Sequence, residues 1–158
     1  MAKYGIQFAN QTTSTSLKSI LGAYMVTTAT CFGEIVEVIV TGAGSVTPAD
    51  NAIGAHLTGV TFGATGVSTS ITPIPFANGA TAAVGNYGSN YSTEPTTTSA
   101  VCPVRFGFNQ RGGMRWAVPQ GEGYRIHADG GTERGAVIQT VGSAAGAADA
   151  TMNFWLQN

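Results

Sequence analysis

Glu34-Ile-Val-Glu-Val-Ile-Val-Thr41 is the stretch that decides the fold. Apart from Glu34 and Glu37, its side chains are apolar on both faces of an extended chain. A half-buried strand alternates apolar and polar residues, whereas a strand covered on both sides is apolar throughout. The stretch therefore predicts a buried strand with protein on both faces.

A period of two dominates the sequence on either side of this stretch. Tyr4, Ile6 and Phe8 alternate with small or polar residues and predict an opening strand, and Met152, Phe154 and Leu156 predict a closing one. Further β-rich runs lie at 53–62, 67–74, 101–110, 114–118, 124–128 and 136–141, and the closing strand spans 150–157. About nine short antiparallel strands with regular turns predict an all-β fold, a β-sandwich or jelly roll of eight to nine strands with little helix.

Few segments depart from this pattern. Gly63-Ala-Thr-Gly66 predicts a hairpin turn between two of the runs. Short helical turns are expected only at 16–21 and after Thr47, where a capping hydroxyl precedes a proline. Residues 76–99 lack a convincing strand and are expected to form a long surface loop that carries Tyr87 and Tyr91.

The composition points to a subunit of an assembly. Only 9% of the 158 residues are charged, against about a quarter in an ordinary globular domain. A free monomer with so few charges has a poor defence against self-association, so we expect other protein to cover its surface. The length fits one domain, 1–158. A net charge of -1 gives no electrostatic reason to expect nucleic acid or a membrane as a partner.

Residues that could carry chemistry are few. His56 and His127 have no neighbouring metal ligands at the usual spacing, so we expect no metal and no cofactor. Cys31 and Cys102 are expected to be free and buried, although a disulfide stays open. Glu122, Asp129 and Glu133 could pair as the acid and base of a hydrolase, but they lie in or beside glycine-rich turns where solvated carboxylates are common. The expectation is a protein that is not an enzyme.

The order of several short motifs resembles a known group of proteins. These motifs are Thr47-Pro-Ala-Asp-Asn-Ala52, Ser70-Ile-Thr-Pro-Ile-Pro75, Glu94-Pro95, Asn109-Gln-Arg111, Arg115-Trp116 and Pro119-x-Gly121-Glu122. Over residues 3–156 the layout resembles the small jelly-roll proteins of tailed bacteriophages that decorate or cement the capsid exterior. The chain departs from them in its ending, Phe154-Trp-Leu-Gln-Asn158, where related sequences often finish with acidic residues.

The resemblance implies a structural virion protein. Such proteins form dimers or trimers, sit where capsomers meet and hold the shell against the pressure of packaged DNA. We expect a homo-oligomer, a trimer in preference to a dimer, that is made in the host bacterial cytoplasm and binds the major capsid protein on the capsid exterior. Residues 1–30 are expected to include an N-terminal arm that contacts neighbours. The expected contact residues are Tyr4, Tyr87, Tyr91, Arg111 and Trp155, although Tyr4 and Trp155 equally suit the core.

Two other classes of protein stay open at this point. A receptor- or glycan-binding β-module of a phage tail or head fibre would use Tyr87 and Tyr91 to stack on sugars. A hydrolase built on a jelly roll would need the turn carboxylates to act as catalytic groups.

Overall fold

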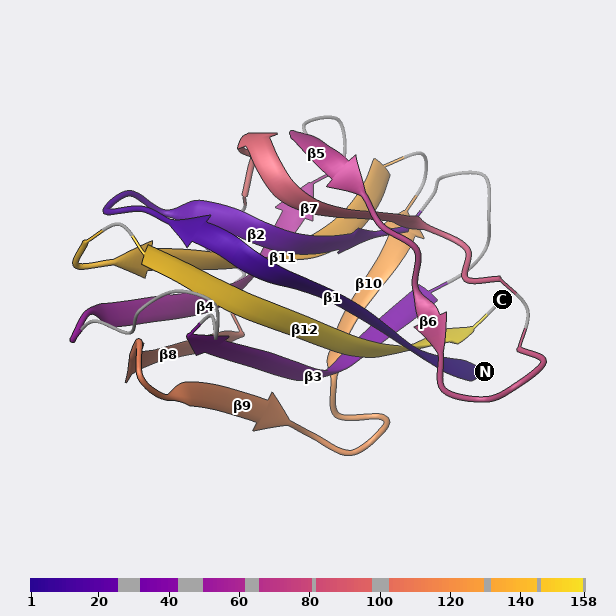
Figure 1. Ribbon diagram of the computed structural model, residues 1–158. Helices are drawn as coiled ribbons and strands as arrows, with labels where there is room; N and C mark the ends of the chain where they lie inside the picture. Colours follow the sequence, from indigo (N-terminus) through magenta and orange to yellow (C-terminus); the bar gives the residue numbers. More distant parts are fainter. Residues whose placement is uncertain are drawn as a thin grey trace.

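The computed structural model describes residues 1–25, 32–42, 50–61, 66–80, 82–97, 103–129, 132–144 and 146–157. These residues are all-β, with no helix among them, and form two antiparallel sheets packed face to face (Figure 1). The strands are β1 (Ala2–Thr13), β2 (Lys18–Tyr24), β3 (Phe32–Gly42), β4 (Ala52–Thr61), β5 (Val67–Ser70), β6 (Ile74–Pro75), β7 (Asn86–Thr93), β8 (Val104–Asn109), β9 (Gly113–Ala117), β10 (Tyr124–Asp129), β11 (Thr132–Gly142) and β12 (Gly146–Gln157).

Eight of these strands have the topology of a jelly roll. One sheet contains β1-β12-β3-β9 and the other β2-β11-β4-β8. Successive strands change sheet, except for β4 and β8, and the first strand pairs with the last. This is the double Greek key of a jelly roll, so the predicted fold class is confirmed.

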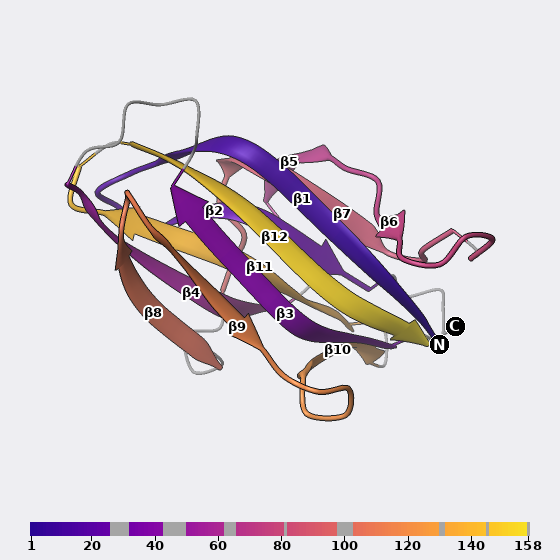
Figure 2. The same ribbon diagram turned by 60° about the horizontal axis from the view of Figure 1, so that its bottom comes forward.

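The other four strands extend this framework. β7 and then β5 widen the second sheet beyond β2, while β6 adds a short strand to the first sheet beside β1. β10 pairs with both β3 and β11 and so joins the two sheets at one corner. The result has two lateral edges on opposite sides, one formed by β5 and β6 and the other by β8 and β9 (Figure 2).

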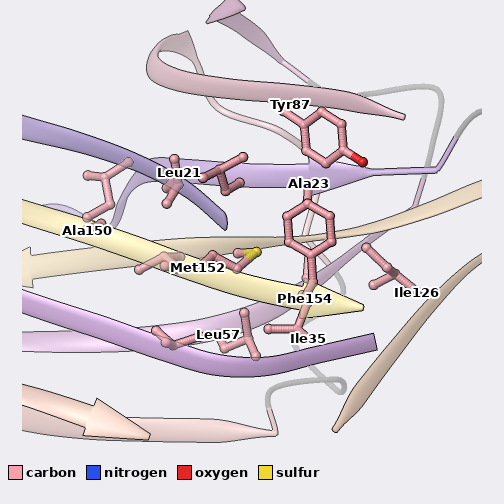
Figure 3. Packing of buried hydrophobic residues seen from close by; sticks show 14 of the residues in the cluster. Leu21, Ala23, Ile35, Leu57, Tyr87, Ile126, Ala150, Met152 and Phe154 are labelled. Carbon is pink, nitrogen blue, oxygen red and sulfur yellow. The ribbon is translucent and has the colours of Figure 1, made fainter. Parts of the chain in front are cut away.

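Aromatic stacking links the two sheets in the core. Phe154 of β12 stacks on Tyr4 of β1, with ring centroids 6.0 Å apart, and on Tyr87 of β7, at 5.3 Å. Figure 3 shows the ring of Phe154 beside Tyr87 and the small side chain of Ala23. All four residues are buried, and aliphatic side chains such as Leu21, Ile35 and Leu57 fill the rest of the core.

A second buried cluster lies on the outer face of the second sheet. It contains Tyr24, Val60, Tyr91 and Val137, and the two phenol oxygens are 2.6 Å apart. Burial raises the pKa of Tyr24 and raises the pKa of Tyr91 to about 12, so both phenols stay protonated at neutral pH. The chain after β7 crosses this face, because β7 pairs with β2 whereas Thr97 bridges to Val60 on β4.

The stretch that decides the fold forms most of β3, as the sequence predicts. Its inward side chains enter the core, while Glu34 and Glu37 lie on the outer face of the first sheet. Glu34 is buried and accepts hydrogen bonds from the backbone N–H groups of Gly121 and Gly123, both at 2.7 Å. The loop between β9 and β10 therefore covers this end of the outer face.

Two expected surface segments are instead parts of the sheets. Residues 2–13 and 18–24 form β1 and β2, so the described part of the expected 1–30 arm belongs to the sandwich. Within the expected loop at 76–99, residues 86–93 form β7. Backbone pairing with β2 and burial of two tyrosines stabilise this strand despite its low content of aliphatic residues.

The turns expected at 63–66, at 16–21 and after Thr47 differ from the structure or lie outside the described residues. β5 pairs with β7, whereas β4 pairs with β11 and β8, so the two runs are not paired as the arms of one hairpin. Residues 63–65 of the expected turn lie outside the described residues. Residues 18–21 are in β2 and not in a helical turn. The expected turn after Thr47, together with Cys31 and Cys102, lies outside the described residues.

Candidate interaction surface

The edge formed by β8 and β9 carries four large apolar side chains. Phe106 and Phe108 lie on β8, and Met114 and Trp116 lie on β9. Their cross-strand partners Ala55, Ile53, Val40 and Val38 are buried in the core, so all four side chains lie on the inner faces of their sheets. Each is half-buried or exposed, because it belongs to the last strand of its sheet on this side.

The turn between β8 and β9 is held firmly to the rest of the fold. Gln110 donates its N–H to the Asn51 carbonyl at 2.8 Å, and Gly42 donates to the Gly112 carbonyl at 3.1 Å. A Cβ at Gly42 would lie 1.8 Å from the Gln110 carbonyl oxygen, so only glycine permits this close approach. These contacts fix the position at which the chain passes from one sheet to the other.

Arginines surround this edge. Between Pro103 and Arg125 only Val104 and Gln110 are buried. This segment contains four of the seven basic residues of the chain, Arg105, Arg111, Arg115 and Arg125, and one acidic residue, Glu122. Aromatic residues, methionine and arginine are the types enriched in protein–protein interfaces. The β8–β9 edge therefore has the composition of a contact surface.

Two ion pairs orient two of the arginines of this edge, Arg111 and Arg115. The Arg111 Nε atom lies 2.9 Å from Asp50 Oδ1, with both side chains exposed to solvent. Arg115 donates to Glu37, whose carboxylate also accepts a hydrogen bond from the Asn153 amide at 2.7 Å. These two hydrogen bonds, the Asn153 one foremost, hold the pKa of Glu37 below its usual value.

The five residues expected at contacts differ in their burial and in their place in the fold. Tyr4, Tyr87 and Tyr91 are buried inside the chain itself, so their expected role as surface contacts is wrong. Trp155 is half-buried on the outer face of the first sheet, between Lys3 on β1 and Glu34 on β3. Arg111 is exposed at the tip of the β8–β9 edge.

The apolar residues of this edge were missed as contact residues for a physical reason. Phe106 and Phe108 belong to an alternating run that predicts a strand, and alternation does not distinguish a central strand from an edge strand. Arginine content is the signal that marks the two edge strands. Arg105 on β8 and Arg115 on β9 place charged side chains on the outward faces of these strands.

The described residues offer no obvious chemical centre. They contain no group of three or more metal-ligating side chains, and no helix among them could cross a membrane. The pKa of His56 is lowered by burial and by the nearby charge of Arg105. Glu122 is exposed on its turn, and the side chains of Asp129 and Glu133 lie outside the description.

No protein-family model matches this chain, and no curated protein matches it in sequence.

Proposed function

We propose that this chain is a structural virion protein, a decoration or cement protein that binds the outer surface of a bacteriophage head and stabilises contacts between capsomers. It forms a homo-oligomer, a trimer in preference to a dimer, and binds the major capsid protein on the capsid exterior. It acts by non-covalent contact and not as an enzyme.

The proposal rests on the apolar side chains that are partly exposed at the β8–β9 edge. Its half-buried aromatic side chains contact the chain's own core on one side and are left uncovered on the other. Covering Phe106, Phe108 and Trp116 with a second protein surface would bury the rings that dominate interface energetics. The surrounding arginines supply directional hydrogen bonds at the rim.

The low charge of the whole chain supports the same proposal. Sister copies meet without strong repulsion when each carries 7 basic and 8 acidic residues. The jelly-roll framework also holds the β8–β9 edge in place, since β8 pairs with β4 and β9 pairs with β3 along their lengths.

The mass of the purified protein in solution tests the self-association. We expect a trimer, and we expect Met114→Glu to produce a folded monomer, because it places a charge on an exposed position of the apolar edge. Leu17→Glu is the matched control, since Leu17 is exposed between β1 and β2, and neither of these strands pairs with β8 or β9.

Imaging of undecorated phage heads mixed with the protein tests the capsid contact. The expected result is regular additional density on the outer shell that is lost with Met114→Glu and kept with Leu17→Glu. A strictly monomeric protein that leaves the heads bare would contradict the proposal.

A further inference from the structure

A pocket of about 250 Å³ opens on the outer face of the first sheet, near the β5–β6 edge. Its floor is a square of four cross-strand neighbours: Gly5 and Gln7 on β1 face Asn153 and Thr151 on β12. The wall is the segment Ile74-Pro-Phe76, which pairs with β1 through β6. Three elements that are distant in sequence therefore build one site.

An exposed aromatic ring forms the principal wall. Phe76 is 61% exposed, the highest value among the large apolar side chains of the described residues. Its backbone N–H donates to the Lys3 carbonyl at 3.0 Å, which fixes the wall to β1. The Lys3 ammonium lies 4.8 Å from the ring centroid. Gln7 lines the pocket and Lys3 does not, so the pocket adjoins the ring on the side away from this ammonium.

Glycine at position 5 lets the Asn153 amide and the Phe76 ring lie close to the backbone of β1. A Cβ there would lie 2.7 Å from the Asn153 Oδ1 atom and 3.2 Å from a ring carbon of Phe76. Every larger residue would push the amide and the ring away from these positions. The pocket floor thus depends on a missing side chain.

The amide of Asn153 is held in one orientation. Its Nδ2 group donates to Glu37 Oε2 at 2.7 Å, and an ionised carboxylate can only accept hydrogen bonds. The other end of the amide, Oδ1, must then point toward Gly5 and the pocket. Asn153 is only 7% exposed, and no described residue donates a hydrogen bond to this oxygen. This oxygen is directed into the pocket and is available to accept a hydrogen bond from a ligand.

The pocket has no free charge for a charged ligand. Glu37 is already paired with Arg115, and Lys3 lies against the aromatic ring. The groups left to bind a ligand are the Gln7 amide, the Thr151 hydroxyl, the Asn153 carbonyl oxygen and the face of Phe76. Amides and hydroxyls both donate and accept, which matches sugar hydroxyls, while an aromatic face packs against the C–H face of a sugar ring.

We propose that this pocket is a binding site for a neutral sugar residue, with Phe76 as the stacking platform and Asn153 as a fixed acceptor. Its volume is somewhat below the roughly 300 Å³ at which drug-sized sites begin, so it accommodates one sugar ring of a larger glycan. β6, which forms part of the wall, lies on the side of the molecule opposite β8 and β9 (Figure 2). The site is therefore separate from the proposed capsid contact and goes beyond it.

Amide chemical shifts of the assigned protein test this site directly. The probes are the methyl glycosides of glucose, galactose, mannose and N-acetylglucosamine, each titrated into the millimolar range. We expect at least one of them to shift the amide signals of Gly5, Gln7, Phe76, Thr151 and Asn153 in a saturable way.

Variants of the pocket provide the controls. Phe76→Ala should weaken binding at least tenfold, and Thr151→Val should weaken it several-fold with little effect on the fold, because valine has nearly the same shape. Leu17→Ala, which removes an exposed apolar side chain elsewhere, should leave binding unchanged. Met114→Glu should also keep sugar binding, so failure of the capsid proposal is distinguishable from failure of this one.

Three outcomes would overturn the inference. One is the absence of saturable shifts with all four glycosides. Another is equal affinity in the folded Phe76→Ala variant. The third is a pocket that binds a short apolar peptide, such as a leucine-containing tripeptide, while ignoring the sugars.

Discussion

The two lateral edges of the sandwich expose apolar side chains in different surroundings. At the β8–β9 edge, aromatic rings lie between the two sheets and arginines surround them. At the β5–β6 edge, Ile74 and Phe76 stand on the outer face of one sheet beside neutral amides. The first arrangement suits a broad protein surface, and the second suits a small neutral ligand. Exposure of apolar groups therefore does not define a partner until the neighbouring polar groups are considered.

The largest loss of stability is expected for removal of the Phe154 ring, which lies in the core and at neither edge. Phe154→Ala should lower the free energy of unfolding by about 3–5 kcal/mol, because it leaves a cavity between Tyr4 and Tyr87. Phe76→Ala should change it by less than about 0.5 kcal/mol, since that ring is mostly solvent-exposed. Urea denaturation of both variants measures the difference. Similar losses in the two would show that Phe76 is a core residue and not a ligand platform.

A smaller effect is expected at the loop next to the β8–β9 edge. Glu34→Ala should cost about 1–3 kcal/mol, because the N–H groups of Gly121 and Gly123 lose a buried acceptor. Glu34→Gln keeps a carbonyl oxygen and should cost less. Urea denaturation gives the cost, and amide hydrogen exchange at the two glycines shows whether the loop opens. Unchanged exchange in Glu34→Ala would contradict the anchoring role of this carboxylate.

The contribution of the Arg115–Glu37 ion pair to stability should depend on pH. The pKa of Glu37 is lowered in the folded chain, so its contribution to stability is present above the unfolded pKa of about 4.3 and is lost as the pH falls through the folded value. The effect should be below about 1 kcal/mol, since Arg115 is largely exposed. Denaturation from pH 7 to pH 3 should show a steeper loss in the wild type than in Glu37→Gln. Identical slopes of stability against pH in the two proteins would contradict the role of ionised Glu37 in orienting Asn153.

The smallest effect is expected at the tip of the β8–β9 edge. Arg111→Ala should lower the free energy of unfolding by less than about 1 kcal/mol, because the pair with Asp50 is exposed on both sides. Thermal unfolding at low and high salt measures this difference. A larger loss that salt does not reduce would show that Arg111 has a structural role instead of being available for a partner.

Local sequence patterns predict the strands but not all of their places. Alternation in Tyr4–Phe8 and Met152–Leu156, together with the apolar run of β3, predicts the centre of the first sheet. β7 was missed because its sequence, Asn-Tyr-Gly-Ser-Asn-Tyr-Ser-Thr, has the composition of a loop. Its strand depends on pairing with β2 and on tyrosine burial, which are tertiary effects.

The candidate surfaces were harder to predict for the same reason. Tyr87 and Tyr91 are four residues apart and would share a face in a regular strand, yet they enter different clusters. Asn90 between them has a φ of 49°, a left-handed conformation that interrupts the alternation. The pocket likewise joins residues 5–7, 74–76 and 151–153, which only the fold brings together.

Amide hydrogen exchange of the assembled protein tests whether the β8–β9 edge is the surface that contacts other protein. The protein is compared free at low concentration and assembled on phage heads. We expect new protection in β8 and β9, residues 104–109 and 113–117, with little change at residues 74–76. Protection confined to the β5–β6 edge, or no protection at either edge, would contradict it.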